Sequence, residues 1–238
     1  GVTGLCQTSG NNSDKNTSLF SGCTSLTTVI LPAGISDFGI GGSVFKNCSA
    51  LTTIKVGEDG ENNVLSGVTL LGTNAFESAG IESLSLPNLT SIGASAFTKS
   101  KVKSVSLPQL TTLADLLFAS CTSLTQVVLN DNAEALGNSM FEGCTALKTI
   151  TLPSNLTHLG KTTFKGSGIT SIVIPDGVTH ISDKSGSPAG TGVSVYVFQN
   201  CKQLESVTLP ANLQTMGQYV FAGCSKLATV TYTSGTEE

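Results

Sequence analysis

The sequence predicts a solenoid of stacked, short parallel strands, and three observations support this fold class. First, a phenylalanine recurs along the chain, at Phe20, Phe45, Phe76, Phe97, Phe118, Phe141, Phe164, Phe198 and Phe221. Second, successive phenylalanines are separated by 25, 31, 21, 21, 23, 23, 34 and 23 residues, so a base period of 21–23 residues has three expanded intervals. Third, each phenylalanine is followed by two recurring apolar segments. Periods of this length are typical of repeats that bury their apolar faces against one another.

The first recurring segment, L-x-x-V-x-L-P, predicts a strand in each repeat. Side chains two positions apart share a face of a strand, so Val29 and Leu31 are expected to point inward while Thr28 and Ile30 point outward. A proline closes most of these segments, which suits the end of a strand because proline cannot donate to a neighbouring strand. The predicted strands centre on Val29, Ile54, Leu84, Val105, Val127, Ile150, Ile172, Val207 and Val230.

The second segment, L/V-T-x-I/L-G, predicts a shorter extended run that ends in a tight turn, as at 89–93, 156–160 and 178–182. Only about three residues separate it from the next phenylalanine. That length suffices for one helical or 3₁₀ turn, which makes the predicted class an α/β solenoid with single helical turns. Polar insertions at 7–17 and 183–194, and an acidic one around 57–67, are predicted to form loops that leave the stacked core intact.

Composition excludes several classes of function. Charged residues make up 12% of the chain, the net charge is −4, and all basic residues are lysines, so nucleic-acid binding is not expected. No run approaches eighteen apolar residues, so no membrane insertion is expected. No serine or cysteine can be matched with a histidine and an acid as a catalytic triad. The chain is therefore predicted not to be an enzyme and to need no cofactor.

Six cysteines stand three residues after a phenylalanine, at Cys23, Cys48, Cys121, Cys144, Cys201 and Cys224. In those repeats five residues separate the phenylalanine from the next apolar anchor, and in repeats without cysteine only four do. We interpret these cysteines as small buried side chains with a weak donor that fill a larger turn. Disulfide bonds between adjacent repeats are the alternative, because stacked positions lie about 5 Å apart. Cys6 occupies a turn position and is the thiol expected to be exposed.

Two features offer metal ligands, and neither forms a convincing site. His158 and His180 occupy the same position of consecutive repeats, which repetition alone explains. The loop GEDGENN at 57–63 clusters acidic oxygens but lacks the spacing of a calcium loop. We therefore predict no metal site.

The outward row of the predicted strands is the main candidate for binding. It comprises two positions per repeat, and thirteen of these eighteen positions are serine or threonine, with no aromatic side chain. Such hydroxyls also keep exposed strands soluble, but solenoids commonly bind partners on this face. The candidate binding residues are Ser104, Ser106, Gln126, Thr149, Thr151, Ser171, Ser206 and Thr208.

The repeat resembles the BspA-like leucine-rich repeats of bacterial and protist surface proteins. The resemblance rests on strings such as FEGCTALKTITLPSNLTHLGKTTF (141–164) and FQNCKQLESVTLPANLQTMGQYVF (198–221). It implies a right-handed leucine-rich-repeat solenoid that is secreted or displayed on a cell surface. The family is associated with adhesion, so the resemblance implies binding to a host extracellular-matrix or cell-surface protein.

The whole chain, residues 1–238, is expected to form one domain of about nine repeats with a partial first repeat. No polar cap is recognisable at either end, so we expect it to be a fragment of a longer surface protein. A protein-binding or cell-adhesion module is the leading functional hypothesis. The alternatives are a glycan-binding module, which the lack of tryptophan disfavours, and a structural spacer without a ligand. The sequence does not fix the oligomeric state.

Overall fold

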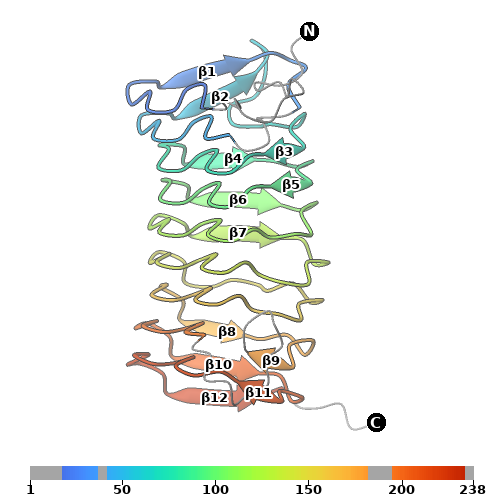
Figure 1. The fold of residues 1–238 in the computed structure, drawn as a ribbon, viewed down its shortest axis with the longest axis vertical. Helices are drawn as coiled ribbons and strands as arrows, with labels where there is room; N and C mark the ends of the chain where they lie inside the picture. Colours follow the sequence, from blue (N-terminus) through green and yellow to red (C-terminus); the bar gives the residue numbers. More distant parts are fainter. Residues whose placement is uncertain (1–17, 37–41, 182–194, 234–238) are drawn as a thin grey trace, which may run out of the picture.

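The computed structural model describes residues 18–36, 42–181 and 195–233. They form a stack of similar coils, and each coil contributes one rung to a column of parallel strands (Figure 1). The strands of this column are β1 (Thr28–Leu31), β2 (Thr53–Val56), β4 (Ser83–Ser85), β6 (Ser104–Leu107), β7 (Gln126–Leu129), β8 (Ser171–Val173), β10 (Ser206–Leu209) and β12 (Thr229–Tyr232). The predicted solenoid of parallel strands is therefore confirmed. The predicted insertions at 7–17 and 183–194, and Cys6, lie outside the described residues.

A second set of two-residue strands corresponds to the second recurring segment. β3 (Leu70–Leu71) pairs with β5 (Ser91–Ile92), and β9 (His180–Ile181) pairs with β11 (Thr215–Met216). All pairings in both sets are parallel, and equivalent repeat positions are partners, as in Val29 with Ile54. The repeat register predicted from the sequence is thus the register of the fold.

The core lies between the two sets of strands. The predicted alternation holds, since Val29 and Leu31 are buried while Thr28 and Ile30 are exposed. The nine phenylalanines form one continuous column, in which neighbouring ring centroids are 5.3–5.6 Å apart. Stacking of equivalent rings buries the large apolar surface that a single repeat would expose to water.

The predicted helical or 3₁₀ turns are wrong, because the described residues contain no helix. From Phe76 to Phe221, the corner around each phenylalanine instead uses positive φ angles two residues before and two residues after the ring, as at Ser95 (59°) and Lys99 (58°). A helix needs negative φ throughout. Besides tight turns within the repeat, such as Thr98 N to Ser95 O at 3.1 Å, these corners hydrogen-bond between repeats, as in Ser95 N to Asp115 O at 3.0 Å and Phe97 N to Leu117 O at 3.0 Å. The fold is therefore built from strands and turns.

The cysteines have the role predicted from turn length. Cys48, Cys121, Cys144 and Cys201 are buried, and all six described cysteines are free thiols. Each of these four sulfurs donates to the carbonyl oxygen of the phenylalanine in the preceding repeat, for example Cys121 Sγ to Phe97 O at 2.8 Å. The weak donor satisfies a buried acceptor, so the structure favours the packing interpretation over the disulfide alternative.

The insertion around 57–67 was predicted to form a loop outside the core, but part of it joins the strand column. Its residues 62–65 lie between β2 and β4 and bridge both strands: Val64 pairs with Ser85, and Asn63 bonds to Ile54. Asn63 has a φ of 61°, and its side-chain oxygen accepts from Ile54 N at 2.8 Å. Asparagine tolerates this backbone conformation, so one residue replaces part of a strand ladder.

One predicted strand is absent. The rung centred on Ile150 is extended, but the structure assigns no strand to 149–152. It separates the set β4-β6-β7 from the set β8-β10-β12. The column of strands is therefore interrupted here, in the middle of the candidate binding face.

Candidate functional site

The candidate site is the outward face of the strand column, which we call the strand face. None of its eighteen outward positions is buried, so every side chain proposed from the sequence reaches solvent. Lys55 is the one charged residue among these positions. The face therefore offers hydroxyls, amides and a few aliphatic groups, and it holds no cluster of acids or bases that would support acid–base chemistry.

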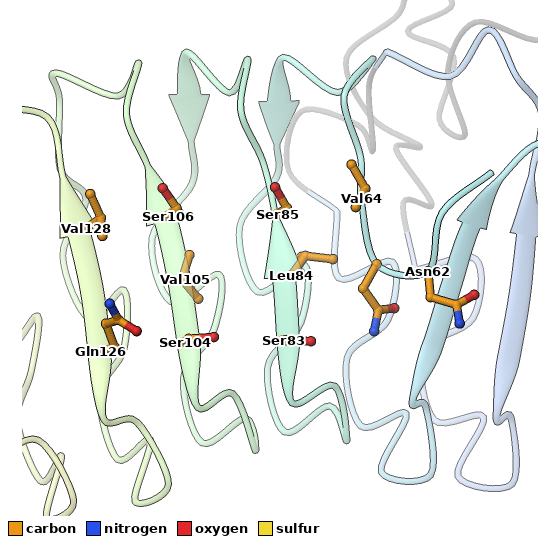
Figure 2. A pocket seen from close by; sticks show the side chains of 11 residues that line it. Asn62, Val64, Ser83, Leu84, Ser85, Ser104, Val105, Ser106, Gln126 and Val128 are labelled. Atoms are coloured by element: carbon orange, nitrogen blue, oxygen red, sulfur yellow. The ribbon is translucent and has the colours of Figure 1, made fainter.

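The candidate residues fall into neighbouring hollows. The first hollow, of about 360 Å³, lies over β4 and β6, where four serines form its floor. Figure 2 shows these small side chains between two taller walls, each of which combines an amide with a valine. The walls are Asn62 and Val64 on one side and Gln126 and Val128 on the other, and the serines are Ser83, Ser85, Ser104 and Ser106.

Two more hollows flank the extended rung at 149–152. One, of about 430 Å³, lies between β7 and this rung. The other, of about 370 Å³, lies between the rung and β8. Gln126, Thr149 and Thr151 line the former, and the candidates on the latter are Thr149, Thr151, Ser171, Ser206 and Thr208. The structure thus brings all eight predicted residues to three adjacent hollows.

Sequence reasoning missed the wall formed by Asn62 and Val64, because it treated their segment as a loop. The asparagines of this segment were a usable signal, since asparagine is enriched where φ is positive. Sequence reasoning also gave no weight to the aliphatic residues on the face. Val128 and Val173 are 45% and 60% exposed and provide apolar surface beside the hydroxyls.

Charge gathers at the edges of the strand face. At the corner side, ion pairs join adjacent repeats: Lys46 to Glu77 at 2.8 Å and Lys165 to Glu142 at 3.3 Å. Such exposed pairs contribute little to stability. Acidic residues lie in the turns after the strands, as at Asp131 and Asp176. The strand face is therefore a neutral strip between charged margins.

Each histidine ring lies against the hydroxyl of the threonine that precedes it. Nδ1 of His158 lies 2.7 Å from the Thr157 hydroxyl, and Nδ1 of His180 lies 2.7 Å from that of Thr179. Across 18–36, 42–181 and 195–233, no three histidine, cysteine, aspartate or glutamate side chains come together as metal ligands. The described part of the chain also lacks a helix that is long and apolar enough to span a membrane.

Burial raises the pKa of the cysteine thiols that pack at the phenylalanine corners. Desolvation raises the pKa of Cys121 from 9.0 to about 11 and also raises that of Cys144 well above its ordinary value. The unfolded thiols ionise first as pH rises. The contribution of Cys121 to stability is therefore fully present below about pH 9 and is lost as pH rises toward 11.

We expect ionisation linked to Cys121 to lower the free energy of unfolding by about 2 kcal/mol between pH 9 and 11. Urea unfolding at several pH values measures this fall. The variant Cys121→Ala should show a shallower decline over the same interval, because it lacks one of the titrating groups. An equally steep decline in wild type and variant would contradict the assignment.

Comparisons with known proteins agree with the geometry. A family model described as a BspA type leucine rich repeat region matches six copies, over residues 7–64, 69–185 and 191–238. The crystal structure of a leucine-rich repeat protein from Bacteroides ovatus is 28% identical, with a TM-score of 0.65, over 90% of this chain and 57% of that one. The chain thus spans little more than half of that relative's length. No curated protein is similar enough in sequence to count as a relative.

Two further solved structures are more distant. A leucine rich cell surface protein from Faecalibacterium prausnitzii is 19% identical, with a TM-score of 0.42, over 89% of this chain and 80% of that one. The pneumococcal vaccine antigen PcpA is 17% identical, with a TM-score of 0.49, over 89% of this chain and 58% of that one.

Proposed function

Because this chain belongs to the BspA-type leucine-rich repeat family, we propose that it is a non-enzymatic protein-binding module, of the kind that mediates adhesion, in a secreted or surface-exposed protein. The partner we propose is a host extracellular-matrix or cell-surface protein. The strand face makes the contact. The observation that carries this proposal is the continuous neutral face, which is hollowed over its central repeats and bordered by charge.

The chemistry of the face supports a protein partner over a glycan. Sugar rings are commonly bound by stacking on tryptophan or tyrosine, and no aromatic side chain occupies the eighteen outward positions. Serine floors and valine walls instead suit the mixed polar and aliphatic surface of a folded protein. A glycan remains the second candidate, favoured only by the density of hydroxyls.

We expect that replacing Ser104 and Ser106 together with arginine weakens partner binding at least about tenfold, because two long side chains fill the first hollow. Binding is measured by biolayer interferometry against immobilised matrix proteins, with a glycan panel in parallel. The control is Thr122→Arg, at an exposed corner position outside the strand face. Loss of binding in the control alone would move the site to the corners, and silence of the wild type on both panels would favour a spacer.

Salt provides an independent check on the same complex. Since Lys55 is the one charge on the face, the dissociation constant should change less than about threefold between 0.1 and 1 M sodium chloride. A steep loss of affinity with salt would instead assign the contact to the charged margins.

A further inference from the structure

The rung at Thr149–Leu152, which we call the open rung, lacks the main-chain pairing of its neighbours. Among the residues that the structure describes, no backbone hydrogen bond joins it to Gln126–Leu129 on one side. Toward β8 the pairing is limited to Thr170 N, which donates to Lys148 O at 2.9 Å, just before the rung begins. Peptide groups of a parallel strand point to both neighbours. Those of the open rung therefore point into the two flanking hollows.

The open rung is held at both of its ends, so its position is fixed. In the corner before it, Ser120 N donates to Glu142 O at 2.6 Å. In the turn after it, Ser154 N donates to the Asp131 carboxylate at 3.0 Å and Asn155 N donates to Asp131 O at 3.3 Å. The rungs thus meet at their ends and separate between them. Unmade main-chain bonds in such a place are available to a ligand.

The separation also exposes part of the core. The central inward residues of β1, β2, β4, β6, β7, β8 and β10 are buried, whereas Ile150, at the same position, is only half-buried. Ile150 lines both flanking hollows. Val128 also lines the hollow on the β7 side, and Val173 lines the hollow on the β8 side. An aliphatic floor between exposed valines matches an aliphatic side chain, and the threonines beside it add hydroxyls.

We propose that the open rung binds an extended, uncharged polypeptide segment, whose main chain bonds to the free peptide groups and whose aliphatic side chain contacts Ile150. This inference rests on the proposed function and names the element of the partner that is recognised. Free main-chain donors and acceptors in alternation are complementary to another main chain, as in strand addition. The lining residues carry no lysine and one acid, Asp131, which already accepts from Ser154. The site therefore does not select an ionic ligand.

The test uses a defined probe, an acetylated and amidated heptapeptide of alternating threonine and valine. Amide chemical shifts of the whole chain are followed by NMR during titration to millimolar peptide. We expect shifts and slowed hydrogen exchange at 126–129 and 149–152, and smaller changes at β1 and β10. A matched peptide with N-methylated main-chain amides should bind at least about tenfold more weakly, because it has lost its donors.

Two variants test the contact from the protein side. Ile150→Lys places a charge on the floor of the hollows, and Thr151→Arg, at an exposed position, blocks them without touching the core. Both should weaken peptide binding at least about tenfold. The matched control is Ile30→Lys on β1, where the isoleucine is 55% exposed and the rung is paired.

The outcomes separate this inference from the proposed function. If matrix-protein binding is lost in the Ser104 and Ser106 double variant while the peptide gives no shifts at the open rung, the inference fails and the function stands. If the N-methylated peptide binds as well as the parent, main-chain recognition is wrong. If neither variant set changes binding to any partner, the strand face is not the binding surface.

Discussion

Replacing Phe141 with alanine is expected to lower the free energy of unfolding by about 3–5 kcal/mol. Its ring has no solvent exposure and stacks on two others, with centroids 5.6 Å from Phe118 and 5.4 Å from Phe164. Removing it opens a cavity in the middle of a column whose other rings cannot close the gap, because each is held by its own repeat. Urea unfolding followed by circular dichroism measures the change.

Phe221→Ala is the matched control for this substitution. Phe221 is only half-buried, and within the described residues it stacks on one ring, Phe198, at 5.4 Å. Phe221→Ala should therefore lower the free energy of unfolding clearly less than Phe141→Ala does. Equal losses for the two variants, or a loss below about 1 kcal/mol for Phe141→Ala, would contradict a column stabilised by stacking between neighbours.

Replacing Gly168 with alanine should also lower the free energy of unfolding, by roughly 1–3 kcal/mol or more, because the backbone of Gly168 packs directly against the backbone of the preceding repeat. A Cβ atom at Gly168 would meet the carbonyl group of Thr145 in the preceding repeat, with the carbonyl carbon at 2.7 Å. The same approach lets Gly168 N donate to Cys144 O at 3.0 Å. The groups that contact Gly168 are backbone atoms and cannot turn aside as a flexible side chain would. The two repeats would therefore have to move apart to admit a Cβ atom.

Gly166→Asn is the matched control, because Gly166 lies close to Gly168 in the chain but a Cβ atom there would meet no backbone of a neighbouring repeat. Gly166 has a φ of 65° and open space around its Cα, and asparagines occupy the equivalent position at Asn47 (61°) and Asn200 (59°). We expect a change of about 0.5 kcal/mol or less in the free energy of unfolding. Thermal unfolding of the two variants side by side would show the contrast, and a larger loss at Gly166 than at Gly168 would overturn the explanation.

The period of the phenylalanines and the alternation of apolar residues were sufficient to predict the stacked parallel strands and their register. The corners could not be predicted in the same way. Residues such as Leu116 and Tyr219 prefer negative φ, yet here they adopt 58° and 61° because hydrogen bonds between repeats dictate the conformation. Single-residue preferences carry no information about a partner that lies one repeat away.

The candidate site, too, was predictable from the sequence only in part. Strand alternation placed Thr149 and Thr151 on the exposed face, where the structure has them. The open rung itself has no local signature, since its sequence TITL closely resembles the SVSL of β6 and the SVTL of β10, which are paired rungs. Its lost pairing depends on the spacing to neighbouring rungs, which is a property of the stack as a whole.

The hydrogen bonds between repeats at the phenylalanine corners all point the same way along the long axis, which gives this side of the solenoid an electrical direction. In each fully described corner from Phe76 to Phe164, three N–H groups donate to the following repeat, as Leu116, Phe118 and Ser120 donate to Asn138, Met140 and Glu142. These peptide dipoles are aligned in three columns parallel to the long axis, like those along an α-helix. Their positive pole, however, faces the C-terminal end of the stack, whereas an α-helix has its positive pole at its N-terminus. The column of phenylalanine corners, which contains no helix in the described residues, therefore carries a helix-like dipole of reversed sense, whereas bonds elsewhere in the repeats, such as Gly168 N to Cys144 O, run the opposite way.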